Sequence, residues 1–382
     1  MHRVTGTYHV SSTLGEPVRA CVPYRLPPTD PALSPTSYDT LNRQAELALA
    51  RLSGMAGLVP SIDWVQYGPI LNEALLTSQI EGTQATLPDL LDDEAAFTVS
   101  NPDDVQEVTN YLRAFRLVQD NLRSPSGLPI SVRLVCDAHR LLLDGRRGAG
   151  KQPGELRRSQ NWIGGTGPGN AAFVPPPPER VPELLADLER FIHDPSSPLP
   201  PLVKTALIHA QFETIHPFLD GNGRIGRLLI AALLEHWGLL PEPLLYLSSF
   251  FKQHQKEYYR RLGGVRIDGD WEGWVSFFLE GVCIAAAEAE GSIVAVASLV
   301  AADRRRLLAS PKAGPASYRL FELLPMMPRF TVERVRQKLE TTFPTANAAV
   351  KVLEELGIVA ERTGQKTNRS YSYQAYIDLL MR

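Results

Sequence analysis

Apolar side chains recur with the 3.6-residue period of amphipathic helices through most of the chain, whereas strictly alternating stretches are few. This pattern predicts a mainly α protein. Helices are expected over residues 37–51, 67–80, 103–120, 131–143, 182–193, 202–215, 224–236 and 271–298. Residues 1–36 are rich in Pro, Ser and Thr and lack a clear period, so they are expected to form an irregular arm.

The helical pattern is interrupted between residues 145 and 178. Glycine-rich residues 164–169 lead into Phe173, Val174 and the prolines 175–178, which cannot be helical and favour an extended chain. No Lys-Ser or Lys-Thr follows the glycines and no strand-to-helix context surrounds them, so a nucleotide-binding P-loop is not indicated. The segment is expected to be a surface flap with a short β-hairpin.

The C-terminal part has a different pattern. Two short helices over 331–339 and 345–356 precede two strands around a polar turn at 364–369. This order is typical of a winged helix-turn-helix. The chain is therefore divided into a helical N-terminal region over 1–125, a core over 126–290 and a winged-helix domain over 305–382.

The composition is that of an ordinary globular protein, with 44% apolar and 21% charged residues among 382. The net charge of −3 gives no strong overall attraction to nucleic acid or to an anionic membrane. Residues 301–382 nevertheless carry a balance of +6, and the remainder carry −9. Arg362, Lys366 and Arg369 on the wing fit contact with DNA phosphates, but such modules also bind proteins or dimerise, and the sequence leaves both open.

Cys21, Cys136 and Cys283 lie far apart, which argues against a disulfide framework and against a cysteine zinc site. The N-terminus lacks the charged and apolar regions of a secretory signal. No uncharged apolar run reaches the roughly 18 residues of a membrane span. A cytoplasmic protein without a membrane contact is therefore expected.

Residues 216–227, with the sequence HPFLDGNGRIGR, have the composition of an anion site. Pro217 disfavours helical geometry at His216, which is expected to end a helix at the mouth of a loop. Residues 221–223, Gly-Asn-Gly, then lead into the next helix. The first N–H groups of a helix and its dipole favour an anion, and glycine lets these donors approach it closely.

Three charged side chains surround this helix start. Arg224 and Arg227 are three residues apart and hence share a face, and two guanidinium groups beside glycine donors suit a polyphosphate. Asp220 adds a carboxylate, whose natural partner among phosphate-binding groups is Mg²⁺. Each residue alone has an ordinary structural explanation, but together they predict a nucleotide site with His216 as its base.

This segment resembles the His-Pro-Phe-x-x-Gly-Asn-Gly-Arg-x-x-Arg motif of the Fic family at every fixed position. The resemblance implies a helical Fic core that transfers AMP from ATP to a Ser, Thr or Tyr hydroxyl of a target protein and releases pyrophosphate. It implies that His216 is the general base and that Asp220 holds Mg²⁺ or Mn²⁺ at the phosphates. The anion hole and the phosphate contacts would come from Gly221, Asn222, Gly223, Arg224 (β-phosphate) and Arg227 (γ-phosphate).

The resemblance extends over about residues 37–290. It implies that Phe173 and Val174 in the flap pair with a strand of the target protein. It also places Tyr259 near the adenine, although packing in the core explains an aromatic residue there equally well.

Residues 77–82, TSQIEG, place Thr77 and Glu81 four apart on one helical face, with Gly82 ending the helix. The segment also resembles the inhibitory motif of the family. The resemblance implies that Glu81 pairs with Arg227 and so withholds the arginine that the γ-phosphate needs. Orienting a water molecule for removal of AMP is an alternative role for Glu81, which would make the enzyme bifunctional.

A competing hypothesis is a regulator that binds DNA through its winged helix and uses the Fic body as a nucleotide sensor. If the chain is an enzyme, its sequence does not identify the target protein, for which the chain itself is one candidate. It does not identify the preferred nucleotide either. It also leaves the oligomeric state open, and a homodimer is one of the alternatives.

Overall fold

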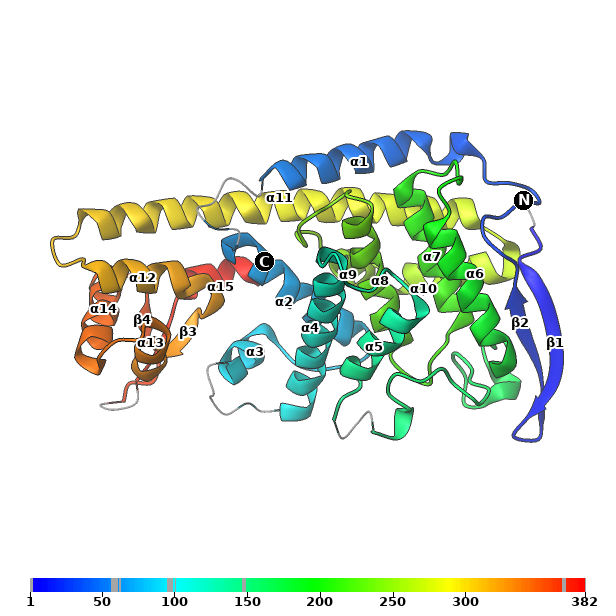
Figure 1. The fold of residues 1–382 in the computed structure, drawn as a ribbon, viewed down its shortest axis with the longest axis horizontal. Helices are drawn as coiled ribbons and strands as arrows, with labels where there is room; N and C mark the ends of the chain where they lie inside the picture. Colours follow the sequence, from blue (N-terminus) through cyan, green and yellow to red (C-terminus); the bar gives the residue numbers. More distant parts are fainter. Residues whose placement is uncertain are drawn as a thin grey trace.

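The computed structural model shows an elongated, mainly helical chain with small antiparallel sheets at its two ends (Figure 1). The structure describes residues 3–55, 61, 63–94, 99, 101–145, 149–365 and 369–381. Helix α11, Trp271–Ala309, runs along most of the length and joins a larger helical body to a C-terminal unit. The expectation of a mainly α fold is confirmed.

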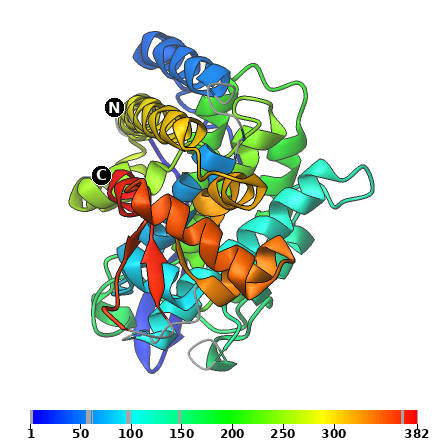
Figure 2. The same cartoon turned by 90° about the vertical axis from the view of Figure 1, so that its left-hand side faces the viewer.

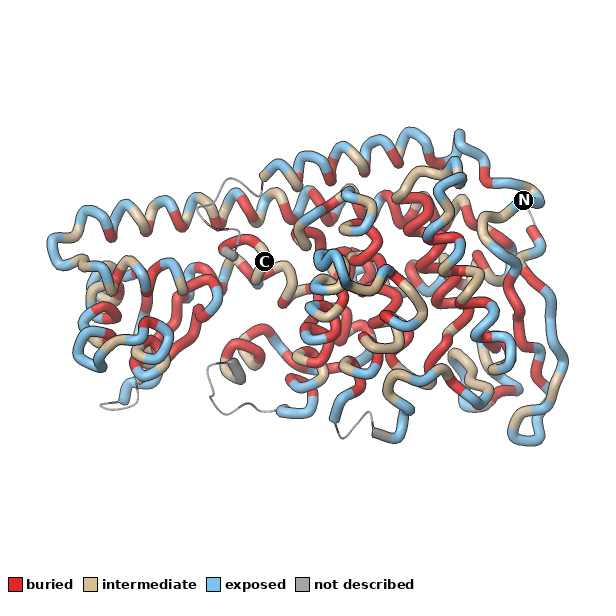
Figure 3. The backbone as a smooth tube through the Cα atoms, viewed as in Figure 1, coloured by how far each residue is buried: buried red, intermediate tan, exposed pale blue. Residues whose placement is uncertain are grey.

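The larger body consists of the helices that precede α11. Their bounds are α1 Asp39–Gly54, α2 Asp63–Ile80, α3 Leu87–Glu94, α4 Pro102–Arg123, α5 Val132–Leu142, α6 Val181–His193, α7 Pro201–Ile215, α8 Asn222–His236, α9 Leu247–Gln253 and α10 Gln255–Asp268. Helix α7 is the centre of the core, because residues 202–215 are all buried (Figure 3). Helices α6, α8 and α11 pack around it, which explains why its apolar residues are not confined to one face.

The first residues form a β-hairpin, so the expectation of an irregular arm is wrong. Strand β1, Gly6–Thr13, pairs antiparallel with β2, Glu16–Pro23, through a two-residue turn at Leu14 and Gly15. Both turn residues have positive φ, 52° and 81°, a geometry that suits the twist of a two-residue hairpin. Residues 20–22 of β2 are buried whereas β1 is largely exposed (Figure 3). Contacts of β2 with distant segments therefore stabilise the hairpin.

The flap is less regular than the expected β-hairpin. One antiparallel bridge joins Ile163 to Phe173, with backbone hydrogen bonds of 2.9 and 3.1 Å. Gly164 and Gly165 have positive φ directly after Ile163 and turn the chain away from the strand. The rest of the flap contains a short 3-10 helix, Pro168–Asn170, so the hairpin is reduced to one bridged pair.

The C-terminal unit contains the two helices and the two strands expected from the sequence (Figure 2). They are α13 Val332–Leu339, α14 Phe343–Glu355, β4 Ala360–Glu361 and β5 Ser370–Ser372. The unit also contains α12 Pro315–Leu323, β3 Arg329–Thr331 and α15 Gln374–Leu380. Strand β5 lies between β3 and β4. The assignment as a winged helix stays a prediction.

Contacts that the sequence did not indicate join this unit to the larger body. The Tyr376 hydroxyl donates to the Trp64 carbonyl at 3.2 Å, and the Asn72 amide donates to the Leu380 carbonyl at 2.8 Å. Near the wing, Arg362 pairs with Asp92 of α3 at 3.2 Å. The predicted wing residue Lys366 lies outside the described residues.

Helix α11 is, among the described residues, long and apolar enough to cross a membrane by length and composition. It also packs against α1, α7 and α9, as a helix of a protein core does. Core helices meet the same length and composition criteria, so the expectation of no membrane contact stays a prediction.

Candidate active site at the start of helix α8

The loop between α7 and α8 has the geometry that the sequence predicts. His216 ends α7 in the left-handed region, with φ 50° and ψ 62°, and its N–H donates to the Phe212 carbonyl at 2.9 Å. Gly221, with φ 78°, then turns the chain into α8, which begins at Asn222. His216 therefore stands at the mouth of a tight loop that leads directly into a helix start.

Buried hydrogen bonds hold this loop from two sides. The Phe218 N–H donates to Asn222 Oδ1 and Asn222 Nδ2 donates to the Phe218 carbonyl, both at 2.9 Å. Arg157, only 2% exposed, donates from Nε to the His216 carbonyl at 2.8 Å and from its backbone N–H to the Pro217 carbonyl at 2.9 Å. The Asn222 side chain thus bonds within the loop, so it is the backbone N–H of Asn222 that could bind an anion.

A histidine outside the predicted motif also supports the loop. His139 of α5 stacks on Phe218, with ring centroids 3.7 Å apart. The Gly154 N–H donates to His139 Nδ1 at 2.9 Å, so Nε2 carries the proton and donates to the Asp220 carbonyl at 3.0 Å. Burial lowers the pKa of His139 to about 4, which preserves this neutral form at pH 7. Sequence reasoning missed His139 because it is distant in the chain.

The first turn of α8 presents backbone donors. The N–H groups of residues 222–224 precede the first intrahelical bond, which runs from Ile225 to the Gly221 carbonyl at 3.0 Å. A Cβ on Gly223 would lie 2.3 Å from Glu81 Oε1, so a negatively charged group already rests against this turn. The helix start therefore has the shape and polarity of an anion site.

The predicted contact between Glu81 and Arg227 is present. Arg227 donates to Glu81 Oε1 at 2.6 Å, to the Thr77 carbonyl at 3.0 Å and to the Thr77 hydroxyl at 2.6 Å. Burial acts to lower the pKa of Arg227, but Glu81 outweighs it and the pKa is raised. Arg227 is only 3% exposed, and these bonds to the C-terminal end of α2 and the residue after it occupy its Nε and Nη2 donors, which a phosphate would otherwise use.

Arg224 and Asp220 flank the same turn. The buried Arg224 pairs with Glu107 of α4 and, at 3.3 Å, with Asp220 Oδ1. The Asp220 side chain is 45% exposed, and its Oδ1 also accepts the Gly221 N–H at 2.6 Å. A single exposed carboxylate fits sites in which Mg²⁺ is held mainly by phosphate oxygens and water. No cluster of three or more His, Cys, Asp or Glu that could hold a metal occurs among the described residues.

The His216 imidazole is partly buried, and its Nδ1 has no hydrogen-bond partner within the described part of the chain. Burial lowers its pKa to about 3, and the positive charges of Arg266 and Arg157 act in the same direction. The ring is therefore neutral at pH 7. A neutral imidazole at the end of α7 can accept the proton of an attacking hydroxyl through a ring nitrogen that the hydroxyl reaches.

A buried carboxyl group that sequence reasoning also missed lies one turn before His216. Glu213 is 6% exposed, and its Oε1 has no partner among the residues that the structure describes. Burial raises the pKa of Glu213 to about 7, against the effect of Arg227. A Cβ on Gly226 would lie 2.4 Å from Oε1, so this glycine leaves the room that the carboxyl occupies.

Phe173 and Val174, expected to offer a free strand edge to a target protein, are flanked on both sides. Phe173 uses its backbone bonds with Ile163, and the Val174 carbonyl accepts the N–H of Cys21 in β2 at 2.9 Å. The Arg266 guanidinium lies over the Phe173 ring, 4.3 Å from its centroid. The expectation of a free edge here is wrong, because the unforeseen N-terminal hairpin occupies it.

Tyr259 of α10 is 49% exposed, whereas its neighbour Tyr258 is buried and bonds through its hydroxyl to His209 at 2.8 Å. Burial raises the pKa of Tyr259, and the charge of Glu81 adds to that effect. The core-packing alternative therefore applies to Tyr258 and not to Tyr259. Contact between Tyr259 and an adenine stays a prediction.

Two family models match the chain. The model described as Fic/DOC family matches residues 129–234, and the model described as Fic/DOC family N-terminal matches residues 40–120. The chain belongs to the Fic/DOC family. The first match contains the whole loop at 216–227 together with its supports His139 and Arg157, and the second contains α2 with Glu81.

Proteins named protein adenylyltransferase are similar to this Fic/DOC chain. The Drosophila melanogaster protein adenylyltransferase Fic is 30% identical over 208 residues, which are 53% of this chain and 38% of the relative. The Caenorhabditis briggsae protein adenylyltransferase fic-1 is 29% identical over 161 residues, 42% of this chain and 30% of the relative. The match thus spans less than two fifths of the length of these relatives.

Solved Fic structures have the same fold. A Fic family protein from Desulfovibrio desulfuricans G20 superposes with a TM-score of 0.57 at 22% identity, over 89% of this chain and 96% of that one. Fic-1 from C. elegans superposes with a TM-score of 0.55 at 22% identity, over 67% of this chain and 74% of that one. At these identities the likeness establishes the fold and no more.

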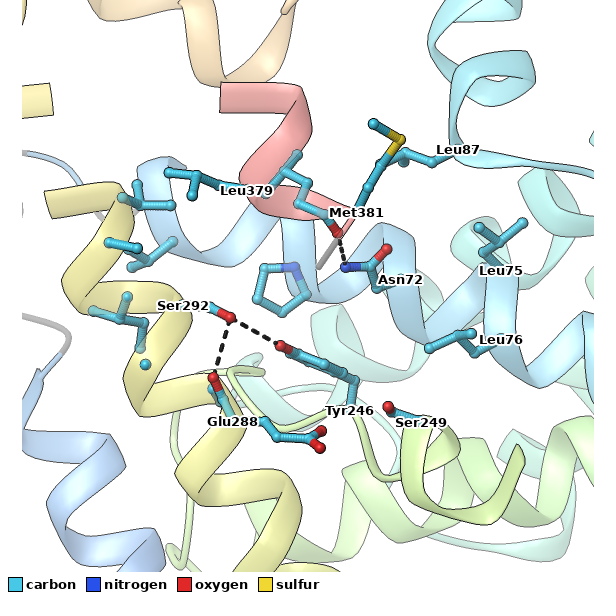
Figure 4. A pocket seen from close by; sticks show the side chains of 18 of the residues that line it. Asn72, Leu75, Leu76, Leu87, Tyr246, Ser249, Glu288, Ser292, Leu379 and Met381 are labelled. Atoms are coloured by element: carbon cyan, nitrogen blue, oxygen red, sulfur yellow. Dashed lines mark hydrogen bonds between the residues drawn. The ribbon is translucent and has the colours of Figure 1, made fainter. Parts of the chain in front are cut away.

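A separate cavity of about 710 Å³ lies beside α2, between α2, α11 and α15 (Figure 4). The Tyr246 hydroxyl lies 3.4 Å from Ser292 Oγ at its wall, and Asn72 bonds to the Leu380 carbonyl at its rim. None of the residues 216–227 lines it. The cavity is therefore not the site at the start of α8.

Proposed function

We propose that this chain is a protein adenylyltransferase, which transfers AMP from ATP to a hydroxyl group of an acceptor protein. One observation carries the proposal: His216, which is neutral at pH 7, ends α7 at the loop whose next turn presents the backbone N–H groups of residues 222–224. The names of the relatives support it. Since the match covers only part of those relatives, their activity comes to this chain as part of the proposal.

In the proposed reaction the acceptor hydroxyl oxygen attacks the α-phosphorus of ATP. His216 takes the hydroxyl proton, the bond from the α-phosphorus to the bridging oxygen breaks, and pyrophosphate leaves. The N–H groups of residues 222–224 stabilise the negative charge, since the Gly221 N–H is bonded to Asp220 Oδ1, and Arg224 and Arg227 bind the β- and γ-phosphates. Asp220 would hold Mg²⁺, or Mn²⁺, which when bound neutralises phosphate charge.

Glu81 acts, in this proposal, as an inhibitor within the chain. It holds Arg227 and rests against Gly223, so its carboxylate and a phosphate compete for one space. A hydrogen bond to a charged group contributes about 1.5–3 kcal/mol. Loss of that competition is therefore expected to raise activity roughly 10- to 100-fold.

The proposal extends to the rest of the chain. Residues 1–125 carry the inhibitory helix, residues 126–290 form the catalytic core, and residues 305–382 form a winged-helix domain of a cytoplasmic protein. The positive balance of residues 301–382 fits DNA as a partner of that domain, but Arg362 pairs with Asp92 and Arg369 lies over the ring of Tyr371, so both have contacts within the chain. A DNA-binding regulator is therefore the second candidate.

The test compares the wild type, Glu81→Gly and Glu81→Gly/His216→Ala after incubation with ATP labelled at the α-phosphate and Mg²⁺. Glu81→Gly is expected to label protein roughly 10- to 100-fold faster than the wild type. The added His216→Ala change is expected to lower that rate about 10²–10⁴-fold. Mass spectrometry of the labelled protein reports whether the added group is AMP.

A matched control is Glu81→Gln, which keeps the size of the side chain and removes its charge, and is expected to fall between the wild type and Glu81→Gly. Equal labelling by the wild type and Glu81→Gly would contradict the inhibitory role. Labelling that is independent of His216 would contradict the proposed function.

A further inference from the structure

The cavity of about 710 Å³ beside α2 touches the inhibitory segment, residues 77–82, from behind (Figure 4). Its wall on α2 includes Leu76 and Gln79, which are three residues apart and therefore share a helical face. At about 100° per residue, this face is turned away from the one that carries Thr77 and Glu81. The cavity and the start of α8 consequently lie on different sides of α2.

The other walls of the cavity come from separate elements of the fold. Helix α11 contributes Ser292 and Ile293, Tyr246 and Ser249 come from the start of α9, and Leu379 of α15 lies on the side of the C-terminal unit (Figure 4). The inhibitory helix is thus separated from α11 and α15 by a space that no side chain of the described residues fills.

Polar groups with unused hydrogen-bonding capacity lie in the part of the wall formed by α9 and α11. Ser292 Oγ donates to the Glu288 carbonyl at 3.1 Å, so the Tyr246 hydroxyl is the donor in its 3.4 Å contact with Ser292 Oγ. Ser249 Oγ accepts from Gln253 at 3.3 Å, and no acceptor for its own hydrogen occurs among the described residues. A ligand hydroxyl group can therefore donate to Tyr246 or accept from Ser249.

The size and the charge of the cavity indicate which class of molecule suits it. Its volume lies within the range of about 300–1,000 Å³ that is usual for small-molecule pockets. Most of its lining residues are apolar, and Glu288 is the only charged residue among those that the structure describes in the wall. A carboxylate without a basic neighbour in the wall disfavours phosphates and other anions. An uncharged apolar molecule with one hydroxyl group therefore fits best.

A molecule in the cavity affects the inhibitory contact, because α2 needs room to leave it. Thr77 and Glu81 hold the buried Arg227 at 2.6 Å each. Withdrawal of α2 from Arg227 moves the helix toward its other side, where the cavity lies. A molecule packed against Leu76 and Gln79 resists this movement. A molecule that binds only while α2 is in place also stabilises that position by mass action.

We propose that the cavity is a regulatory site for a small uncharged apolar molecule with a hydroxyl group, and that filling it keeps Glu81 on Arg227. The inference rests on the proposed function, since it concerns the inhibition of that reaction. It also gives the C-terminal unit a part in the inhibition, because residues 379–381 belong to the wall.

Gly291 offers a substitution that fills the cavity without a ligand. It lines the cavity on α11, and a Cβ at this position would meet no atom within 4 Å. Gly291→Leu therefore adds an apolar side chain at the cavity and removes a residue that helices disfavour. Gly291→Ala, which adds only a methyl group, is the matched control. A melting temperature that is not lowered excludes loss of the fold.

The test measures protein labelling by the wild type and by Gly291→Leu, each with and without Glu81→Gly, from Mg²⁺ and ATP labelled at the α-phosphate. Decan-1-ol is the probe for the site. Decanoate, which has the same chain length and a negative charge, is its control. Hydrogen exchange of the α2 amides is a second readout, which does not depend on activity.

Gly291→Leu and decan-1-ol are each expected to slow labelling by the wild type about fivefold or more and to slow exchange in α2. Gly291→Ala and decanoate are expected to have little effect. In the Glu81→Gly protein, neither Gly291→Leu nor decan-1-ol is expected to change the labelling rate, because the contact that they strengthen is absent.

Unchanged labelling and exchange with both Gly291→Leu and decan-1-ol would overturn the inference, and so would equal slowing of labelling in the Glu81→Gly protein. Slowing by Gly291→Leu without an effect of decan-1-ol, or an equal effect of decanoate, would overturn the ligand class. Absence of His216-dependent labelling in every protein would overturn the proposed function, whereas exchange in α2 would still decide whether the cavity takes the probe.

Discussion

The loop at 216–227 and the surface made by the flap and the N-terminal hairpin are organised in opposite ways. The loop is held by buried side chains, with Arg157, His139 and Asn222 each bonded to its backbone. The hairpin buries one strand and exposes the other along its whole edge. A buried, over-determined loop suits chemistry that tolerates little movement, whereas an exposed strand tolerates substitution at its surface.

If this contrast is right, removing one buried side chain that supports the loop lowers the free energy of unfolding by a large amount. Arg157→Ala removes a 2%-exposed guanidinium that bonds to the carbonyls of His216 and Pro176 and leaves those carbonyls unsatisfied. The variant is expected to lose about 3–4 kcal/mol of unfolding free energy. Urea unfolding followed by circular dichroism measures the loss.

The neighbouring residue provides the control. Arg158 is exposed and pairs with Glu155, three residues away, so Arg158→Ala is expected to change the unfolding free energy by about 0–1 kcal/mol. Equal losses for the two variants would break the contrast between a buried support and a surface charge.

The same contrast separates what the sequence could predict from what it could not. The course of the loop follows from Pro217 after His216 and from Gly221 before α8, which are local effects of neighbouring residues. The contact of Glu81 with Arg227 joins residues far apart in the chain, and only the resemblance to a family motif predicted it.

The sequence did not predict the N-terminal hairpin, and the reason is physical. Strand β1 alternates polar and apolar residues only over the short stretch 7–11, and β2 is buried by the flap, which lies about 150 residues later. His139 and Arg157 were missed likewise, because a histidine or an arginine in isolation gives no sign of which backbone carbonyl it will meet. Helix α15 was missed because its seven residues are too few for a period and it is stabilised by contacts with α2.

Glu213 shows that the buried region also contains a destabilising feature, because the ionised form of its carboxyl group is unfavourable there. Its folded-state pKa of about 7 lies above the ordinary 4.5, so its contribution to stability is fully present below pH 4.5 and is lost as the pH rises through 7. The wild type is therefore expected to lose about 2 kcal/mol between pH 5 and pH 8 from this group. Glu213→Gln, which cannot ionise, is expected to lack that loss.

Urea unfolding of the two proteins at pH 5 and pH 8 measures the difference. The buried histidines His139, His209 and His216 have lowered pKa values and give the opposite dependence below pH 6.5, but they are present in both proteins and cancel in the comparison. An identical change with pH in the wild type and the variant would show that Glu213 does not titrate in this range.

The smallest effect is expected at the tip of the hairpin, where the surface region carries local strain. Leu14 is 80% exposed and has φ 52°, a conformation that leucine adopts at a cost and asparagine adopts more readily. Leu14→Asn creates an Asn-Gly turn and is expected to stabilise the hairpin by about 0.5–1 kcal/mol. Slower hydrogen exchange of the amides that join β1 to β2 would report it. Leu14→Ala keeps the strain and is expected to leave exchange unchanged, so equal slowing in both variants would trace the effect to loss of the exposed leucine and not to the turn.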